Sequence, residues 1–250
     1  MSTLSLDSIA VDCPDAEALA TFYATLLDVP NEGDCIHIRD GQVEIWFQQV
    51  ENYAAPTWPT QERGQQVHFD LAARDWQAAV ARAESLGAKR VQAEPDGDHV
   101  VVMVDPAGHT FCMCNPWEEL ADRLPEADDV PILTNVTVDC ADVHALAAFY
   151  NQLTGYEIVD FGTWGAVKGD PIGLVLFQPV ENYAAPTWPT QERGQQMHFN
   201  FHTADRDAYV ARAVELGAEV AYVAGGFTVM KDPAGHPFCI CNPAECELGK

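Results

Sequence analysis

The chain has few basic residues and no apolar run of the length that crosses a membrane. Its 13 lysines and arginines stand against 38 aspartates and glutamates, which gives a formal net charge of −25. A surface of this sign repels nucleic-acid phosphates and anionic lipids, so partners of both classes are disfavoured. It would attract a cationic ligand, although an acidic surface more often serves solubility or tolerance of high salt.

The first residues, 1–10, lack the basic start and the apolar stretch of a cleavable signal, so we expect a cytoplasmic protein. The eight cysteines include no Cys-x-x-Cys pair, and we expect reduced thiols, most of them buried as small apolar groups. At 250 residues, 48% of them hydrophobic, the chain is long enough to bury the core of one or two globular domains.

One segment of 17 residues, VENYAAPTWPTQERGQQ, occurs twice without change, at 50–66 and at 180–196. Each copy runs into an apolar stretch that carries a histidine in its second place, His68 and His198. Self-similarity over a fixed spacing indicates a tandem duplication.

The sequence around this segment repeats less closely. Asp15, for example, matches Asp142 at a spacing of 127, and an acidic stretch with prolines separates the two halves. We therefore predict a first module at 1–118, a linker at 119–130 and a second module at 131–250.

The pattern of apolar residues predicts short strands and amphipathic helices. Residues 4–12 alternate apolar and polar side chains, as a half-buried strand does. Asp15 is suited to cap the helix that follows, whose apolar residues recur at helical spacing. The other elements expected in the first module are strands at 35–39 and 43–48 joined by a turn at Asp40 and Gly41, strands at 68–72, 100–104 and 110–114, another strand near Val91, and a helix from Asp75 to Gly87. Each module thus reads as two βαβββ units, and the fold class is α+β with four such units.

Four motifs, each present in both modules, carry a resemblance to a known family. They are D-x3-LAxFY, PTWP followed by QxHF, a helix that ends in LGA, and DPAGHxFCxCNP. In this order they resemble the glyoxalase-like branch of the vicinal oxygen chelate superfamily, which also contains bleomycin-resistance proteins and extradiol dioxygenases. The resemblance implies that paired βαβββ units curl their sheets around one cleft. The chain is then similar to a fused family dimer, with a cleft in each module and a monomeric state with internal pseudo-two-fold symmetry.

In the metal-binding members of that superfamily, three strand positions supply ligands, usually as His, His or Gln, and Glu. The residues at these positions are Ser8, His68 and Cys112 in the first module and Asn135, His198 and Cys239 in the second. Only the histidines fit that pattern, so we expect no metal. If a divalent ion such as zinc is bound, its ligands would be His68 and Cys112, or His198 and Cys239.

The two histidines differ in their neighbours. The apolar residues that flank His68 should face the helices, which leaves His68 and Asp70 on the concave side of the sheet. A core imidazole bonded to a backbone carbonyl is the alternative. Asp70 is able to raise the pKa of its histidine and to orient it as a base, whereas Asn200, beside His198, lacks the charge. If the protein is an enzyme, the catalytic candidates are therefore His68, Asp70 and His198.

The unchanged segment also predicts a wall for a ligand. Prolines flank Trp58 and Trp188 and stiffen the backbone, which presents a flat ring for stacking on a planar molecule. The further ligand-binding candidates, in the same segment or on the strand before it, are Tyr53, Tyr183, Arg63, Arg193, Trp46, Gln48 and Gln178. The alternatives are a loop that plugs the cleft or the module interface, or a segment made identical by recent gene conversion. Because Leu176 stands where the first module has Trp46, the two clefts are not expected to be equivalent.

These observations favour a metal-free protein that binds a planar or partly cationic small molecule. The first alternative is a lyase, isomerase or dioxygenase of the same superfamily that uses a divalent ion at His68 or His198. The second is a regulatory or interaction module without a small-molecule ligand.

Overall fold

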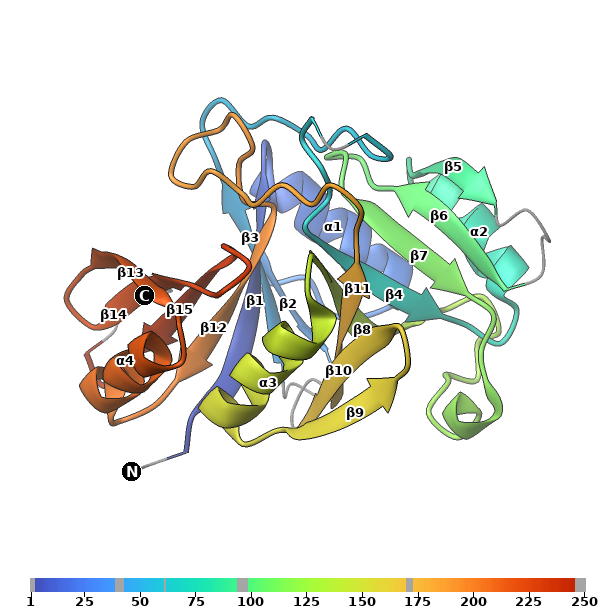
Figure 1. Ribbon diagram of the computed structural model, residues 1–250. Helices are drawn as coiled ribbons and strands as arrows, with labels where there is room; N and C mark the ends of the chain where they lie inside the picture. The colour runs from blue at the N-terminus through green and yellow to red at the C-terminus, as the bar shows by residue number, and fades with distance from the viewer. Residues whose placement is uncertain (1–2, 39–42, 61, 94–98, 170–172, 246–250) are drawn as a thin grey trace.

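The computed structural model describes residues 3–38, 43–60, 62–93, 99–169 and 173–245, and within these ranges it contains four α-helices and two β-sheets (Figure 1). The turn predicted at Asp40 and Gly41 lies outside the described residues. Within the described part of the chain, no helix is both long and apolar enough to span a bilayer. The seven cysteines of these ranges are free thiols, as predicted.

The elements of the first module follow the predicted order. Its first unit contains β1 (Ser5–Cys13), α1 (Ala16–Leu27), β2 (Cys35–Ile38) and β3 (Val43–Gln49), and its second contains β4 (Val67–Ala72), α2 (Trp76–Ser85), β5 (Lys89–Ala93), β6 (Val100–Val104) and β7 (Thr110–Cys114). The first unit is shorter than predicted, because one of its strands is reduced to an isolated bridge between Asn31 and Ile36.

The second module repeats this order with complete units. The third unit contains β8 (Ile132–Cys140), α3 (Val143–Thr154), β9 (Glu157–Phe161), β10 (Trp164–Gly169) and β11 (Gly173–Pro179), and the fourth contains β12 (Met197–His202), α4 (Arg206–Glu215), β13 (Glu219–Val223), β14 (Phe227–Lys231) and β15 (Pro237–Cys241). The fold class is therefore the predicted α+β arrangement of βαβββ units.

Aspartate side chains begin the helices as the sequence predicts. Asp15, Asp75 and Asp142 accept hydrogen bonds from backbone N–H groups three residues later, at 3.0, 2.9 and 3.0 Å respectively. Each bond satisfies an N–H group that the first helical turn leaves unpaired, which contributes about 1 kcal/mol to helix stability.

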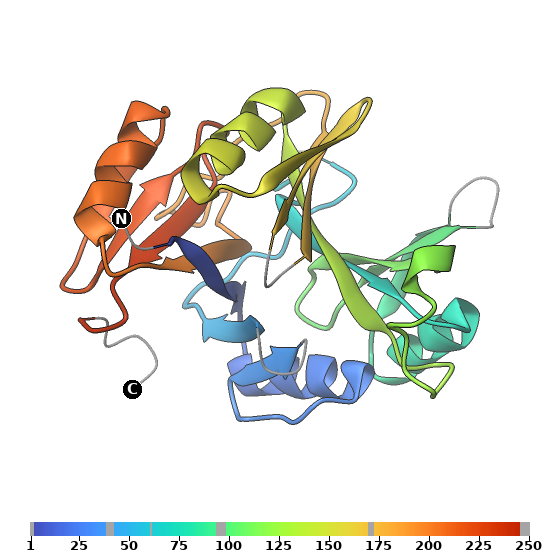
Figure 2. The same ribbon diagram turned by 90° about the horizontal axis from the view of Figure 1, so that it is seen from below.

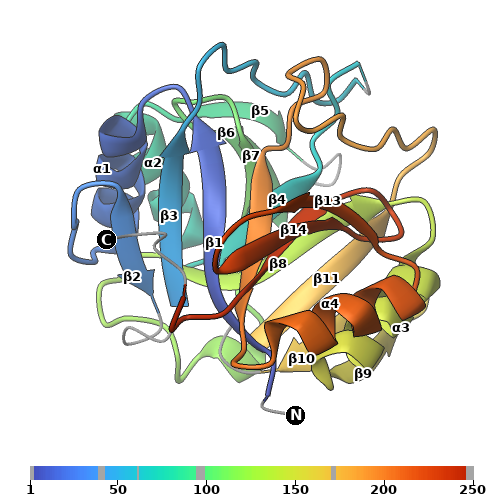
Figure 3. The ribbon, with the colours of Figure 1, turned by 90° about the vertical axis from the view of Figure 1, so that its left-hand side faces the viewer.

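The pairing of the sheets differs from the prediction. One sheet, called sheet A here, has the order β13-β14-β15-β12-β1-β3-β2, and sheet B has the order β5-β6-β7-β4-β8-β11-β10-β9. Sheet A therefore joins the first unit to the fourth through β1 and β12, and sheet B joins the second to the third through β4 and β8. The expected cleft within each module is thus wrong, because each concave face combines strands of both modules (Figure 3). All four units offer the same kind of first strand at the joining edge, so strand periodicity does not distinguish the partners.

On the helix-covered faces, the aromatic side chains group within each module, inside a hydrophobic core that is continuous through both. Tyr23 of α1 packs against Phe47, Phe69 and Phe111, with its ring centroid 5.6 to 6.4 Å from theirs. Tyr150 of α3 repeats this arrangement in the second module, where its partners are Phe177, Phe199 and Phe238. Figure 2 accordingly shows α3 next to α4, away from α1. The aromatic clusters therefore each lie within one module, whereas each sheet contains strands of both modules.

The two unchanged loops lie side by side and hydrogen-bond to each other (Figures 1 and 3). The Gln66 carboxamide donates to the Gly194 carbonyl oxygen at 2.9 Å, and the Gln196 carboxamide donates to the Gly64 carbonyl oxygen at 2.7 Å. Both glutamines are buried. Because the two copies of the segment contact each other, a substitution in one copy must remain compatible with the other. For this part of the segment, the contacts support the prediction that the loop fills the interface between the modules.

The same loops attach to the central strands of the opposite module. The Gln195 carboxamide donates to the carboxylate of Asp12 on β1 at 3.1 Å, and the Gln65 carboxamide donates to Asp139 on β8 at 3.4 Å. Burial raises the pKa of Asp12 to about 7 and that of Asp139 to about 6, although the glutamine bonds act in the other direction. These buried carboxyl groups therefore lie at the junction of the two modules.

The predicted linker is packed against sheet B. It contains the short 3-10 helix Glu118–Leu120, and Leu120 and Leu124 lie against Ala72 of β4. The guanidinium of Arg74 donates to backbone carbonyl oxygens of this segment at 3.0 to 3.1 Å. The segment is thus held over one end of the sheet.

The reciprocal glutamine bonds generate a first prediction. Gln66→Ala and Gln196→Ala each leave a buried carbonyl group without its donor, so each should lower the free energy of unfolding by about 1 to 3 kcal/mol. Urea unfolding at neutral pH measures the loss. Gln48→Ala is the matched control, because Gln48 is exposed at the end of β3. Losses no larger than that of the control would contradict the proposed importance of the loop pairing.

Candidate functional site

A row of polar side chains crosses the concave face of sheet B. The strand register places Asp70 of β4 opposite Asn135 of β8 on one side and opposite Cys112 of β7 on the other. His68 lies opposite Thr137 on the same two strands. Side chains two residues apart on a strand share a face, so the register gathers these five residues from both modules.

Asp70 is at the centre of this row. Its Oδ2 accepts a hydrogen bond from the Thr137 hydroxyl at 2.6 Å, and its Oδ1 lies 3.4 Å from Nε2 of His68. One ligand atom from each of His68, Asp70 and Cys112 lies within 4.8 Å of the others. His68 and Asp70 are both buried, with exposed fractions of 4% and 7%, so the predicted concave face is covered at this point.

The carboxylate of Asp70 sets the protonation of its neighbours. Burial alone would lower the pKa of His68, but the charge and hydrogen bond of Asp70 outweigh it and raise the pKa above its ordinary 6.5. Burial, reinforced by the Asp70 charge, raises the pKa of the Cys112 thiol well above 9.0. Within the described ranges, Nδ1 of His68 is buried without a hydrogen-bond partner.

This donor set fits a divalent ion better than the sequence predicts. His68 and Cys112 were expected as its ligands, and the structure adds the Asp70 carboxylate as a third donor. Nitrogen, sulfur and oxygen donors of this kind suit zinc, which in catalytic sites commonly takes three protein ligands and one water.

The equivalent row in sheet A carries no carboxylate. His198 of β12 has Asn200 as its neighbour on the same face, and the Asn200 carboxamide donates to the Ser8 hydroxyl at 3.1 Å. Cys239 of β15 lies opposite Asn200. Burial lowers the pKa of His198 to about 4. The pKa is therefore raised for His68 and lowered for His198, as the difference between Asp70 and Asn200 predicts.

A hollow on sheet B lies beside the Asp70 row. Its volume is about 480 Å³. The lining residues are Asn135 of β8, Leu174 and Leu176 of β11, Trp164 of β10, Phe161 of β9, and Trp117 from the segment after β7. Phe161 and Trp117 are 52% and 43% exposed, so the hollow is an aromatic-walled cleft open to solvent.

The aromatic residues that wall this hollow are not among the site residues predicted from the sequence. Trp164 and Phe161 lie on strands whose counterparts in the first unit are short, and Trp117 lies at the module boundary. The strand pairs align the two units: Cys35 lies opposite Trp46 on β2 and β3, as Ala166 lies opposite Leu176 on β10 and β11. On that alignment Trp164 has no aromatic counterpart in the first module.

The corresponding part of sheet A is occupied by a side chain. Glu44 and Trp46 of β3 stand where β11 has Leu174 and Leu176. The indole Nε1 of Trp46 donates to the Glu44 carboxylate at 2.7 Å. The two clefts are thus not equivalent, as predicted from the difference between Trp46 and Leu176.

The polar candidates of the unchanged loops are bonded to the scaffold. The hydroxyl groups of Tyr53 and Tyr183 lie 2.9 Å from Nε2 of His109 and His236. Nε of Arg63 donates to the Ala55 carbonyl oxygen at 2.9 Å, and Nε of Arg193 repeats this bond to Ala185 at 3.0 Å. These contacts are within each module, away from the residues that line the hollow of sheet B.

The remaining candidates lie apart from that hollow. Trp188 packs over Val229, Cys239 and Cys241 on the concave face of sheet A and borders a second hollow. Trp58 is half-buried, Gln48 is exposed and Gln178 is half-buried, and none of the three lines either hollow.

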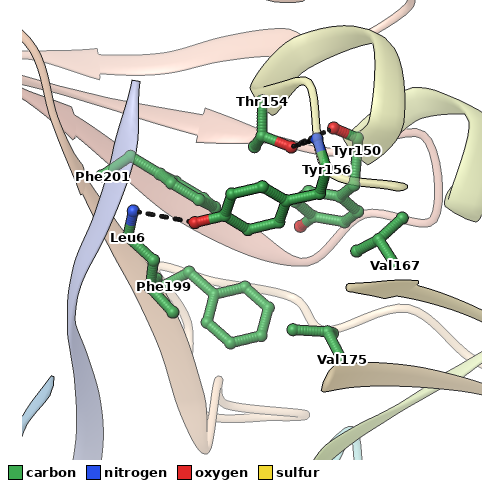
Figure 4. Close-up of a pocket in the computed structure, with 8 residues that line it drawn as sticks. All are labelled: Leu6, Tyr150, Thr154, Tyr156, Val167, Val175, Phe199 and Phe201. Carbon is green, nitrogen blue, oxygen red and sulfur yellow. Dashed lines mark hydrogen bonds between the residues drawn. The ribbon is translucent and has the colours of Figure 1, made fainter. Parts of the chain in front are cut away.

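A small void lies between the start of β1 and α3 (Figure 4). The Leu6 backbone N–H donates to the Tyr156 hydroxyl there at 3.3 Å. The void has a volume of about 10 Å³, which is room for one water molecule at most. It is therefore a packing gap between the first, third and fourth units.

Exchanging the two residues beside the histidines tests the role of the Asp70 charge. Asp70→Asn should lower the pKa of His68 below 6.5, because burial, the largest influence, is then opposed only by the charge of Asp139, and Asn200→Asp should raise the pKa of His198. NMR titration of the imidazole resonances measures both. In the wild type, protonated His68 stabilises the fold below pH 6.5, and this contribution is lost as the pH rises through its raised pKa. Neutral His198 stabilises the fold above pH 6.5, and this is lost as the pH falls towards about 4. Unchanged titration curves in both variants would contradict the assignment.

Comparison with known proteins agrees with this architecture. A model of the glyoxalase-like domain matches residues 8–114 and again 135–241. No curated protein matches the chain. Glyoxalase I from Zea mays is similar in structure, with a TM-score of 0.64, 13% identity, and coverage of 96% of this chain and 93% of the other. The "putative dioxygenase" of Bacillus subtilis subsp. subtilis str. 168 has a TM-score of 0.60 and 14% identity, covering 96% of this chain and 86% of the other. At these identities the likeness shows the fold alone. The two copies of the domain model show that the chain belongs to the glyoxalase-like family, within the vicinal oxygen chelate superfamily, as a protein of two tandem modules.

Proposed function

We propose that this protein binds a planar, largely apolar small molecule in the hollow of sheet B, without the help of a metal ion. The observation that carries the proposal is the aromatic lining of this hollow of about 480 Å³. Ligand sites typically have volumes of about 300 to 1,000 Å³ and mostly apolar walls with a few polar groups. Trp164 and Trp117 offer flat rings for stacking, above a floor of Leu174 and Leu176.

Asn135 supplies the polar contact. Among the residues that the structure describes, its carboxamide lines the hollow and makes no hydrogen bond to another side chain. A carboxamide both donates and accepts, so it is suited to orient a ligand that carries a hydroxyl, amine or carbonyl group at its inner edge.

The charge of the protein favours a positively charged ligand. The net charge of −25 attracts cations over a distance that salt limits, and the faces of tryptophan rings attract a cation directly. The proposed ligand is therefore planar and neutral or cationic, and binding would sequester it. A cytoplasmic location and a monomeric state belong to the same proposal.

Two substitutions in the hollow test this function. Leu176→Trp introduces the residue that sheet A has at this position and should fill the hollow, while Trp164→Ala should weaken a stacked ligand by about 1 to 3 kcal/mol. Fluorescence anisotropy with proflavine, a planar cation, measures binding, and the anionic dye fluorescein should bind more weakly. Trp46→Leu on sheet A is the matched control and should leave proflavine affinity unchanged. Equal affinity of all three variants, or no saturable binding by the wild type, would remove the proposal.

A metal-dependent lyase, isomerase or dioxygenase is a second candidate function. The proximity of His68, Asp70 and Cys112 favours it. These three residues would hold the ion, which would polarise a substrate oxygen or activate a water molecule. In this case His68 and Asp70 would bind the ion rather than act as a base, and Thr137 would position the carboxylate of Asp70 through its 2.6 Å hydrogen bond.

Metal analysis of protein purified without a chelator separates the two candidates. The metal-free proposal predicts less than stoichiometric zinc, and little change in melting temperature when zinc is added. A stoichiometric ion that is lost in Cys112→Ala and retained in Cys239→Ala would establish the second candidate instead. Cys239 is the matched control, because the corresponding row of sheet A has Asn200 in place of Asp70.

A further inference from the structure

A second large hollow lies at the outer edge of sheet A, in a different part of the molecule. Its volume is about 450 Å³. Trp188 and Pro189 of the unchanged loop border it on one side, and residues of β13 together with Lys231 of β14 border it on the other. None of these residues lines the hollow of sheet B.

The side of Trp188 that faces sheet A is packed against other side chains. Its ring packs over Val229, Cys239 and Cys241 on the concave face of sheet A. Packing on one face leaves the other side of the half-buried indole towards the hollow. A ring fixed in this way loses little freedom when a planar molecule stacks on it.

A bulge in β13 brings a second aromatic side chain to the same hollow. The register of β13 and β14 shifts between Val220 and Tyr222, so that Tyr222 lies opposite Val229. Val229 and Lys231 are two residues apart on β14 and therefore share a face. The bulge thus turns Tyr222 towards the side of the sheet that Trp188 covers, and the residue is 54% exposed. Bulges commonly redirect a side chain beside a binding site.

Two opposite charges complete the lining. Glu219 and Lys231 are cross-strand partners at the start of β13 and the end of β14, and both border the hollow. Within the described part of the chain, no ion pair of 4.0 Å or less joins Lys231 to a carboxylate. The hollow therefore presents one carboxylate and one ammonium group that remain available to a ligand.

The second unit has the same scaffold without this chemistry. Its β5 carries a bulge at the corresponding place, and Trp58 belongs to an identical loop. Lys89 and Val104 stand there where the fourth unit has Glu219 and Lys231. The opposite charges therefore arose on the sheet of one copy alone, while the loop stayed the same.

We propose that the hollow between Trp188 and β13 is a second ligand site, and that it takes a small aromatic zwitterion such as a free aromatic amino acid. The ligand ring lies between Trp188 and Tyr222. Its carboxylate faces Lys231 and its ammonium group faces Glu219. A ligand with only one of these charges leaves either Lys231 or Glu219 without a partner. The site therefore binds it less tightly than a ligand that carries both charges.

Isothermal titration calorimetry with four related probes tests this assignment. L-phenylalanine carries a ring and both charges, phenethylamine lacks the carboxylate, hydrocinnamate lacks the ammonium group, and cyclohexylalanine lacks the aromatic ring. L-phenylalanine should bind one site per chain, and each of the other probes should bind about two- to fivefold more weakly, the scale of one exposed ion pair or stacking contact. No saturable binding of L-phenylalanine, or equal affinity for phenethylamine, would overturn the proposal.

Variants locate the site. Tyr222 is exposed on the edge strand β13, and Lys231 is half-buried at the end of β14. Tyr222→Ser and Lys231→Gln should both weaken L-phenylalanine binding, and Lys231→Gln should also remove the preference over phenethylamine. Trp188→Ala should abolish binding, while Trp58→Ala, in the identical loop, should not alter it. Leu176→Trp, which fills the hollow of sheet B, should leave L-phenylalanine affinity unchanged. If Leu176→Trp abolishes this binding and Tyr222→Ser does not, the ligand occupies the sheet B hollow and the second site is refuted.

Discussion

The reciprocal hydrogen bonds of Gln66 and Gln196 are the contacts on which the arrangement of the two modules depends. Each carboxamide reaches a buried carbonyl oxygen of the other loop, at Gly194 and Gly64. Backbone bonds extend the same junction, because the N–H groups of Asp12 and Asp139 donate to the carbonyl oxygens of Gln196 and Gln66 at 2.9 and 2.8 Å. A buried group that loses such a partner costs its full desolvation energy. This constraint accounts for the unchanged Gly-Gln-Gln end of the segment, where the two copies bond to each other.

The helix-covered faces of the sheets and their concave faces differ in how the two modules contribute to them. Tyr23 and Tyr150 organise matching aromatic cores within the modules, and the helix-covered faces have therefore diverged little. The concave faces combine strands of both modules, and there the two copies share their histidine and cysteine but differ at Asp70 against Asn200, Leu176 against Trp46, and Lys89 against Glu219. Duplication thus gave one scaffold two chemically different clefts.

Most of the fold was predictable from sequence, because strand alternation, helical spacing and the capping residues Asp15, Asp75 and Asp142 are local signals. The difference between His68 and His198 was predictable for the same reason, since Asp70 and Asn200 are close neighbours on the same strands. Pairing between modules was not, because β1, β4, β8 and β12 are equally suited to join any of the others. The walls of the sheet B hollow were missed as a direct result: Trp117 and Trp164 meet only when strands of the two modules share one sheet.

This shared sheet would link the proposed ligand binding to the assembly of the chain. The hollow of sheet B takes Trp117 from the first module and its floor, walls and polar contact from the second, including Leu174, Trp164 and Asn135. The adjacent polar row is likewise divided, because Asp70 belongs to β4 and its hydroxyl donor Thr137 to β8. A ligand that binds only when both modules are in place stabilises their pairing by mass action. The pairing of β4 with β8 therefore forms the hollow, and the proposed ligand, once bound there, would hold the two modules together.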